Sequence, residues 1–365
     1  MKRLFALIFA MCLLLCGCAT DDPLATMDRI TVPSTEETTE ATTEATTEAT
    51  TVPPVVYINP MTGEELDAPY TGRATTVVIG NTKTALPHHG ISEADICYEI
   101  ESEGGITRIL GVFSQIENVE KVGPVRSART YFNNVTVSYD GTIVHCGGSV
   151  RGRNAGYDDK GKISDWNHLD QVSNGSYFYR DKDRKSSGYA QEHTLFASGE
   201  KLVAGIGSKG FRTASEGEVS YGLQFDENVV LNGETAKEVV ISFLGKKTTT
   251  MTYDEATGLY GMSQYGKETI DGNDDKQVTF KNVIVLYTKQ WKIHDGEYSR
   301  SYYTLVGEGE GYFAVNGQIV PIKWSREDLN KPFSYTLADG TPITLGVGRT
   351  YVAVASVKSN EIAYQ

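Results

Sequence analysis

Two arginines spaced three residues apart form the first group of residues that could do chemistry. They are Arg126 and Arg129 of the stretch GPVRSAR, which precedes TYFNNVTVSY, a stretch with enough apolar residues to form a helix. The N-terminus of a helix is the positive end of its dipole and usually attracts acidic residues. Free backbone N–H groups and two guanidinium groups together predict a site for phosphate or carboxylate. The alternative is that both arginines pair with nearby acids such as Glu120 or lie in solvent.

A histidine closes an apolar strand pattern in the stretch TIVHCGGS. His145 is followed by Cys146, two glycines and Ser149, and glycines after a strand let backbone N–H groups approach a ligand closely. If the protein is an enzyme, His145 could act as general base and Ser149 or Cys146 as nucleophile. The stretch lacks the G-x-S-x-G elbow of hydrolases, however, and a histidine that closes a strand is more often a hydrogen-bonded core residue.

Further charged residues come from the stretch YFYRDKDRKSSGYAQEH, which contains Arg180, Arg184 and His193. Aromatic residues followed by Arg-Asp indicate a strand that delivers charges to a cleft or a loop. The histidines of the chain have no helical ligand spacing, and no compact group of aspartates accompanies them. The sequence therefore predicts no metal site and no cofactor.

A fifth arginine is expected on an apolar strand face. In the stretch ADICYEIESEGGITRILGVF, Arg108 stands between Ile106 and Leu110, and alternate residues of a strand share one face. An arginine at such a position needs a carboxylate partner or an anionic ligand. Glu99 and Glu103 are the candidates for a structural ion pair with Arg108.

Two regions with different predicted secondary structure must position these residues. Residues 57–215 mix strand-like runs with helix-compatible stretches, one of which begins at Ser198, a candidate N-cap. Residues 216–365 are nearly all short alternating runs, broken by the tight-turn signals VNGQ and ADGT. We therefore predict an α+β or α/β N-terminal domain over 57–215 and a mostly-β C-terminal domain, a sandwich or partly closed barrel, over 216–365.

The first residues predict a lipoprotein signal peptide over 1–18. Lys2 and Arg3 precede a short apolar run, and LCGC ends in Cys18, the residue that a bacterial lipobox would lipidate after cleavage. We expect an anchor in the bacterial plasma membrane, on its extracytoplasmic face, through Cys18; a plain cleaved signal peptide is the alternative. Residues 19–56 contain TEATTEATTEATT and almost no large apolar side chains, which predicts a disordered spacer.

The charge of the chain limits its partners. The chain has 34 Lys and Arg against 47 Asp and Glu, and its formal net charge is −13. Because a nucleic-acid site is normally basic, this composition argues against a nucleic-acid partner. Cys97 and Cys146 are the cysteines of the predicted domains, and the sequence leaves open whether they are buried thiols or a disulfide.

Several joined segments resemble a known family. The stretches GITR, GPVRSAR, HCGGS and YFYRDKDRK, and later GYFAVNGQIVPIKW and DGTPITLGVGRTYV, are similar in order to the signature segments of the YerB-like bacterial lipoproteins. The resemblance covers nearly everything after the spacer and implies a two-domain extracytoplasmic lipoprotein of unknown function. Cys146 stands where that family usually has alanine, which speaks against a cysteine nucleophile. The resemblance adds weight to these positions as ligand-binding residues: Asn81, Glu99, Arg108, Arg126, Arg129, His145, Ser149, Arg180 and Arg184.

These residues support three hypotheses about function. The leading hypothesis is an envelope binding module whose arginines form a pocket for an anionic envelope ligand or protein partner. It predicts that Arg126, Arg129, His145 and Arg180 line one cleft. The second is a cell-envelope hydrolase or transferase that uses His145 and Ser149. The third is a structural interaction protein whose arginines form internal ion pairs.

Overall fold

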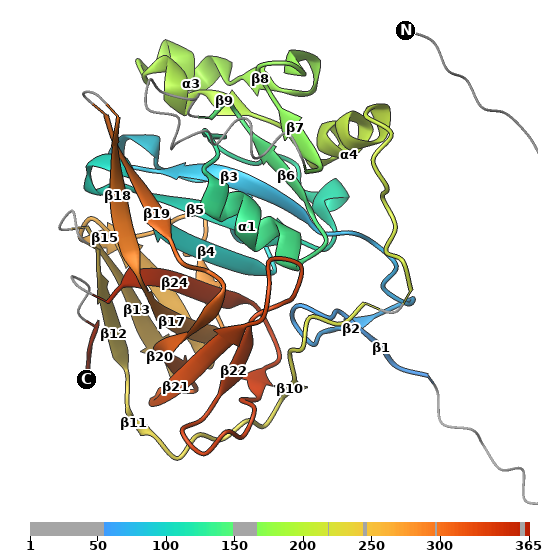
Figure 1. The fold of residues 1–365 in the computed structure, drawn as a ribbon. Helices are drawn as coiled ribbons and strands as arrows, with labels where there is room; N and C mark the ends of the chain where they lie inside the picture. Colours follow the sequence, from blue (N-terminus) through green and yellow to red (C-terminus); the bar gives the residue numbers. More distant parts are fainter. Residues whose placement is uncertain (1–54, 149–165, 218, 244–246, 296–297, 358–361) are drawn as a thin grey trace, which may run out of the picture. The chain divides into compact units, whose positions relative to one another are not determined.

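The protein is built around two open β-sheets (Figure 1). The structure is a computed structural model that describes residues 55–148, 166–217, 219–243, 247–295, 298–357 and 362–365. Cys18, the predicted signal peptide, nearly all of the predicted spacer and Ser149 lie outside these residues. The described part is rich in strands, and neither of its two large sheets closes into a barrel. Open sheets therefore take the place of the partly closed barrel that the sequence allowed for residues 216–365.

The longer sheet has eleven strands among the described residues and mixes parallel with antiparallel pairs. Near its centre, β24 (Thr350–Ser356) runs parallel to both of its neighbours, β17 (Asn282–Thr288) and β4 (Ile96–Glu101). Beyond β17 follow β20 (Gly307–Val315), β21 (Gln318–Arg326) and β11 (Glu234–Thr235), with β22 (Ser334–Thr336) also paired to β21. Beyond β4 follow β5 (Thr107–Phe113), β3 (Thr75–Asn81), β6 (Thr142–His145) and β7 (His168–Asp170). One sheet thus joins strands from residues 57–215 and from residues 216–365.

The shorter sheet has six antiparallel strands within the described ranges. Their order is β15 (Lys267–Glu268), β14 (Leu259–Gln264), β13 (Thr248–Asp254), β12 (Glu238–Ser242) and β25 (Ile362–Tyr364), with β16 (Thr279–Phe280) paired to β14. In β13, Thr249 and Met251 are buried, whereas Thr248 and Thr252 are exposed. This alternation is typical of an antiparallel sheet with one covered face.

Two hydrophobic clusters cover the two faces of the longer sheet. Val77 and Ile79 of β3 belong to the cluster that contains Met251 of the shorter sheet. Val78, between them, belongs to the cluster that contains Phe132 of helix α1 (Thr130–Ser138). Because successive strand residues point to opposite faces, the shorter sheet packs on one face and α1 on the other. All seven residues of β3 are buried, as expected for a strand covered on both sides.

Local sequence signals set several turns and helix ends. Asn316 and Gly317 join β20 to β21 with positive φ values of 52° and 74°, the conformation that a two-residue hairpin turn needs. This turn is the hairpin predicted from VNGQ. Helix α4 (Gly199–Ser208) begins after Ser198, whose side chain accepts a hydrogen bond from the Lys201 N–H at 3.4 Å. Ser198 is therefore the N-cap, as the sequence predicts.

The remaining elements are short. The helical elements are α3 (Lys182–Ser186) and the 3-10 turns at Lys83–Ala85, Glu103–Gly105, Ile116–Asn118, Gly175–Tyr177 and Gln191–His193. Four pairs of strands form separate small sheets: β1 (Tyr57–Ile58) with β2 (Glu65–Leu66), β8 (Tyr179–Arg180) with β9 (Leu195–Phe196), β10 (Phe225–Asp226) with β23 (Leu345–Gly346), and β18 (Gln290–Asp295) with β19 (Tyr298–Tyr303). Across the described ranges, every helix is too short or too polar to cross a membrane.

Candidate functional site

Arg126 and Arg180 line one open cavity of about 480 Å³. Arg126 belongs to the segment that leads into α1, and Arg180 ends β8. The half-buried thiol of Cys146 lines the same cavity. Ser127, Gln191 and Glu192 complete most of the polar lining. Two of the predicted arginines, distant in the sequence, therefore meet in one place.

The backbone around Arg126 is held by three neighbouring segments. The Arg126 N–H donates to the carbonyl of Val78 in β3 at 2.8 Å, and the Arg126 carbonyl accepts from the Cys146 N–H at 3.0 Å. The N–H of Val125 donates to Leu195 of β9 at 2.8 Å. Arg126 therefore lies on a fixed backbone beside the sheet. It precedes the N-terminus of α1, which begins at Thr130, so Arg126 is not part of that helix end.

The guanidinium groups of Arg126 and Arg180 mainly contact backbone oxygens. Arg126 Nη1 donates to the Glu192 carbonyl at 3.2 Å, and Arg180 Nη1 donates to the Gln191 carbonyl at 2.5 Å. The Glu192 carboxylate lies 3.3 Å from Arg126 Nη1, but its side chain is 58% exposed. A carbonyl carries no net charge, and an exposed ion pair is held weakly. The cavity thus has two positive charges opposed by one solvent-exposed carboxylate.

Cys146 is poorly suited to act as a nucleophile in this cavity. Burial raises the pKa of its thiol and the charge of Asp170 raises it further, against the smaller opposite effects of Arg180 and Arg126. Because the thiolate is the reactive form, a raised pKa keeps the side chain unreactive. Cys97 is buried elsewhere, where burial raises the pKa of its thiol to about 12. Both cysteines are free thiols, so the structure contains no disulfide between them.

His145 is buried at the end of β6 and is not among the residues that line the cavity. Its Nδ1 lies 2.8 Å from the Gly147 carbonyl and 3.8 Å from Asp170 Oδ1. A carbonyl only accepts hydrogen bonds, so this contact places the ring proton on Nδ1. The ring is therefore fixed by its own loop, as expected for a hydrogen-bonded core histidine. Ser149, its predicted catalytic partner, lies outside the described residues.

Arg129 forms an internal ion pair. Its Nε and Nη2 donate to the two carboxylate oxygens of Glu103, each at 2.7 Å, in a two-pronged contact. Burial alone would raise the pKa of Glu103, but Arg129 holds this pKa below its ordinary value. The partner is Glu103 rather than the nearby Glu120. Arg129 does not line the cavity between Arg126 and Arg180.

Arg108 is buried directly behind the cavity wall. Its Nη1 donates to the carbonyl of Ser127, a lining residue, at 2.6 Å. Neither Glu99 nor Glu103 forms an ion pair with Arg108. Glu99 points to the opposite face of the sheet, where it pairs with Lys247, and Glu103 pairs with Arg129. Burial, with a smaller effect from the charge of Arg129, lowers the pKa of Arg108 to about 10.

Glu99 and Asn81 belong to a polar network buried between the two sheets. Glu99 pairs with Lys247, a residue that the sequence did not single out. Asn81 Nδ2 donates to Glu99 Oε1 at 3.0 Å and to Thr107 at 2.9 Å. Both side chains are fully buried, so this network joins parts of the fold and does not face the cavity.

Arg184 fastens α3 to the loop that follows β3. Its Nη1 donates to the carbonyls of Ala85 at 2.9 Å and His193 at 3.1 Å, and its Nη2 donates to the carbonyl of Pro87. The guanidinium also lies over the ring of Phe196, 4.8 Å from its centroid. These contacts bury Arg184 and give it a structural role.

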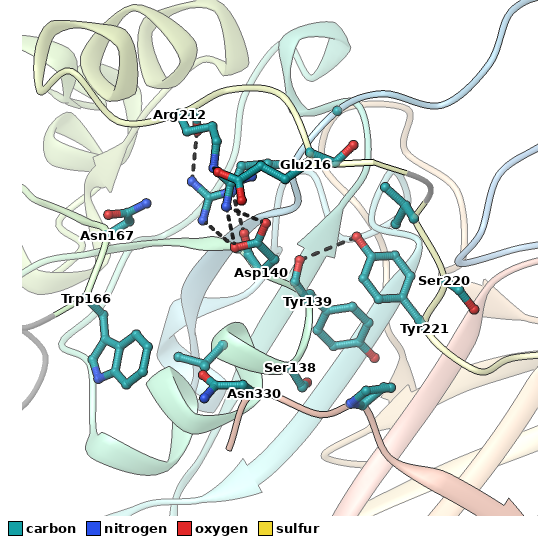
Figure 2. A pocket seen from close by; sticks show the side chains of 17 residues that line it. Ser138, Tyr139, Asp140, Trp166, Asn167, Arg212, Glu216, Ser220, Tyr221 and Asn330 are labelled. Atoms are coloured by element: carbon teal, nitrogen blue, oxygen red, sulfur yellow. Dashed lines mark hydrogen bonds and ion pairs between the residues drawn. The ribbon is translucent and has the colours of Figure 1, made fainter. Parts of the chain in front are cut away.

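A second cavity, of about 560 Å³, lies around Asp140 (Figure 2). Arg73 and Arg212 both contact the Asp140 carboxylate there, at 3.0 and 2.8 Å. Its lining comes from widely separated parts of the chain, so no local motif in the sequence indicated it. The positive φ of Asp140, 49°, reflects the turn that ends α1.

Two family models match most of the chain. The model described as "Protein of unknown function (DUF3048) N-terminal domain" matches residues 61–212, and that of the C-terminal domain matches residues 239–352. The chain belongs to the DUF3048 family. The resemblance stated from the sequence motifs is therefore confirmed.

A similar protein comes from Bacillus subtilis. "Putative lipoprotein YerB" of strain 168 is 28% identical over 281 residues, which cover 73% of this chain and 80% of YerB. The crystal structure of YerB has a TM-score of 0.70 at 24% identity, covering 84% of this chain and 99% of that one. The two proteins therefore share the fold described above.

Proposed function

We propose that this DUF3048 protein is a lipid-anchored envelope protein whose cavity between Arg126 and Arg180 binds a phosphate or carboxylate group of an envelope component or protein partner. The observation that carries the proposal is that these two guanidinium groups line one cavity. Two other predicted arginines make contacts outside this cavity: Arg129 forms an ion pair with Glu103, and Arg184 donates hydrogen bonds to backbone carbonyls.

The contacts of the two arginines leave their charge available to a ligand. Arg126 and Arg180 donate to the adjacent carbonyls of Glu192 and Gln191, and these contacts fix the guanidinium positions without neutralising them. A guanidinium group has donors that match two oxygens of phosphate or carboxylate. The exposed Glu192 side chain can swing into solvent when an anion enters, since such a surface pair contributes little.

Ser127 offers a further polar group to the anion. It lines the cavity, and its carbonyl accepts the hydrogen bond from buried Arg108, which supports this part of the wall. The positive charge of Arg108, just behind the wall, adds to the attraction for an anion without contacting it. The cavity is open to solvent, as a site for a group on a larger molecule requires.

The name of the similar protein YerB and the N-terminal sequence of this chain support a location in the envelope. YerB carries the name of a lipoprotein, and this chain has LCGC at the position expected for a lipobox. We infer an anchor at Cys18 on the extracytoplasmic face of the plasma membrane, with the predicted spacer 19–56 leading to the folded part. An anionic wall or lipid component would then lie within reach.

Isothermal titration calorimetry of the full-length protein in detergent tests the site. Glycerol 3-phosphate and N-acetylalanine serve as probes of phosphate and peptide carboxylate. Replacing Arg180 by alanine should weaken binding of the preferred probe by roughly ten- to a hundredfold, since one charged hydrogen bond contributes about 1.5–3 kcal/mol. Lys182→Ala is the matched control, because it removes an exposed cation close in sequence that does not line the cavity.

Two results would contradict the proposal. One is that neither probe binds the wild-type protein; the other is that Lys182→Ala weakens binding as much as Arg180→Ala, which would indicate general charge attraction. A catalytic role for His145 with Ser149 stays a prediction, because Ser149 lies outside the described residues.

A further inference from the structure

The cavity around Asp140 differs in charge from the one between Arg126 and Arg180. Arg73 and Arg212 supply two positive charges, and Asp140 and Glu216 supply two negative ones. Each cation has a partner: Asp140 lies 3.0 Å from Arg73 and 2.8 Å from Arg212, and Glu216 lies 3.2 Å from Arg212. The charged groups that line this cavity therefore balance, which favours an uncharged ligand.

The polar groups of this cavity are held in place before any ligand arrives. Arg73 Nε donates to the Asp140 carbonyl at 2.7 Å and its Nη1 to the Arg212 carbonyl at 2.8 Å. Arg212 Nη1 donates to the Ala214 carbonyl at 2.8 Å. The Asp140 carboxylate is thus oriented by two fixed guanidiniums, and its own side chain is 53% exposed. Fixed polar groups bind without the entropic cost of ordering them.

An exposed aromatic ring lies at the rim of the same cavity. Trp166 is 38% exposed, whereas the tryptophan at position 324 is buried. Figure 2 shows the indole of Trp166 on the same opening as Asp140 and the Asn330 side chain. Asn330 is exposed and follows β21 in the chain. The cavity thus combines an apolar ring face with amide, carboxylate and guanidinium groups.

We propose that this cavity binds a neutral saccharide, with Trp166 packed against the face of a sugar ring. A sugar ring has an apolar C–H face, which suits the broad, rigid surface of an indole. Its hydroxyls both donate and accept, so one hydroxyl can donate to Asp140 while accepting from Arg212 or from the Asn330 amide. No charged group on the ligand is needed to balance the cavity. This site is independent of the anion site, which has two arginines opposed by one exposed carboxylate.

Tryptophan fluorescence gives a direct test, because the chain has only three tryptophans. The full-length protein carries Trp291→Phe, so that its emission comes from Trp166 and the buried Trp324, and a detergent without a sugar headgroup avoids competition. A trimer of N-acetylglucosamine and maltotriose are the probes, with inorganic phosphate as the charged comparison. At least one saccharide should change the emission saturably, and phosphate should not.

Calorimetry on variants locates the response. Trp166→Ala and Asn330→Ala each remove an exposed side chain, so both variants should fold, and Trp166→Ala should weaken saccharide binding by about tenfold or more. Arg126→Ala should leave saccharide binding unchanged, which separates this site from the anion site. The proposal is overturned if neither saccharide binds, if Trp166→Ala binds as tightly as the parent protein, or if phosphate produces the response instead.

Discussion

The side chain of Lys247 forms an ion pair with that of Glu99 between the two sheets, and both side chains are buried. Glu99 lies on β4 of the longer sheet, and Lys247 directly precedes β13 of the shorter one. Lys247 Nζ donates to Glu99 Oε1, and Glu99 Oε2 accepts hydrogen bonds from Thr249 at 2.8 Å and from Tyr351 at 2.7 Å. The carboxylate is therefore surrounded by donors from both sequence regions, and its contacts link the two sheets.

Replacing Lys247 by methionine should destabilise the protein by roughly 3–5 kcal/mol, since it leaves a buried carboxylate without its counter-charge. Burial alone would raise the pKa of Glu99, but Lys247 holds this pKa below its ordinary value. Removing the lysine should therefore favour the neutral acid. Urea unfolding of the variant, followed by circular dichroism, measures the loss.

An exposed pair in the same half of the chain provides the control for this prediction. Lys237 contacts Glu255 at 2.5 Å with both side chains largely in solvent. Lys237→Met should leave the unfolding midpoint unchanged. The double variant Lys247→Met with Glu99→Gln should recover part of the lost stability, because it removes the unpaired charge. Equal effects of Lys237→Met and Lys247→Met would contradict the role given to the buried pair.

Local features of the fold were predictable from the sequence because they depend on few neighbouring residues. The turn at Asn316-Gly317 needs positive φ values that these two residue types tolerate, and the cap at Ser198 needs only its own helix. In each case the interaction spans a few positions, and the residue type carries the information.

Long-range pairings were not predictable in this way. β24 lies between β17 and β4, and its register, Thr350 opposite Ile96, joins segments that share no local signal. The partners of buried charges depend on such pairings: Arg129 pairs with Glu103 rather than Glu120, and Glu99 pairs with Lys247. The sequence therefore indicated that several arginines needed partners, but only the fold decides which of them remain available to a ligand.

The Arg129–Glu103 pair predicts a pH dependence of stability. The pKa of Glu103 is lower in the folded protein than its ordinary value of about 4.3, because Arg129 outweighs the effect of burial. Its stabilisation is fully present above the unfolded pKa and is lost as the pH falls through the folded pKa. Glu103→Gln should lower stability at pH 7 by roughly 1.5–3 kcal/mol and flatten the acid side of the profile. Urea midpoints between pH 7 and pH 3 measure both effects, and parallel profiles for the two proteins would exclude this role.

Arg126 and Arg184 should respond differently to replacement by alanine. Arg184→Ala leaves the buried carbonyls of Ala85 and His193 without a donor, at about 1–3 kcal/mol each, so it should destabilise by roughly 3 kcal/mol. Arg126→Ala breaks a contact with the exposed Glu192 and should cost less than about 1 kcal/mol. Thermal unfolding of both variants separates the two cases. Unfolding of the Arg126 variant at ordinary temperature would indicate that this arginine is structural, as in the third hypothesis from the sequence.

The N-terminal signal gives a prediction about location. If Cys18 carries the lipid, Cys18→Ala should move the protein from the membrane fraction to the soluble fraction. Cys16→Ala is the matched control, since Cys16 precedes the expected cleavage point and should leave the anchor intact. Fractionation followed by a high-salt wash distinguishes a lipid anchor from charge attraction. A Cys18→Ala protein that stays with the membrane after this wash would rule out the lipobox at this position.

Two glycines of α4 should respond in opposite ways to alanine. At Gly199, a Cβ would lie 1.6 Å from the carbonyl oxygen of Ile116, so the first turn of α4 packs against the Ile116–Asn118 turn at a distance that only glycine permits. Gly199→Ala must displace backbone and should destabilise by roughly 1–3 kcal/mol or more. At Gly207, in the same helix, a Cβ would meet nothing within 4 Å, and Gly207→Ala should stabilise by about 0.5–1 kcal/mol because alanine loses less chain entropy on folding. Thermal midpoints of the two variants give the comparison. If both substitutions raise the midpoint, helix propensity alone decides the outcome and the close packing of α4 at Gly199 is wrong.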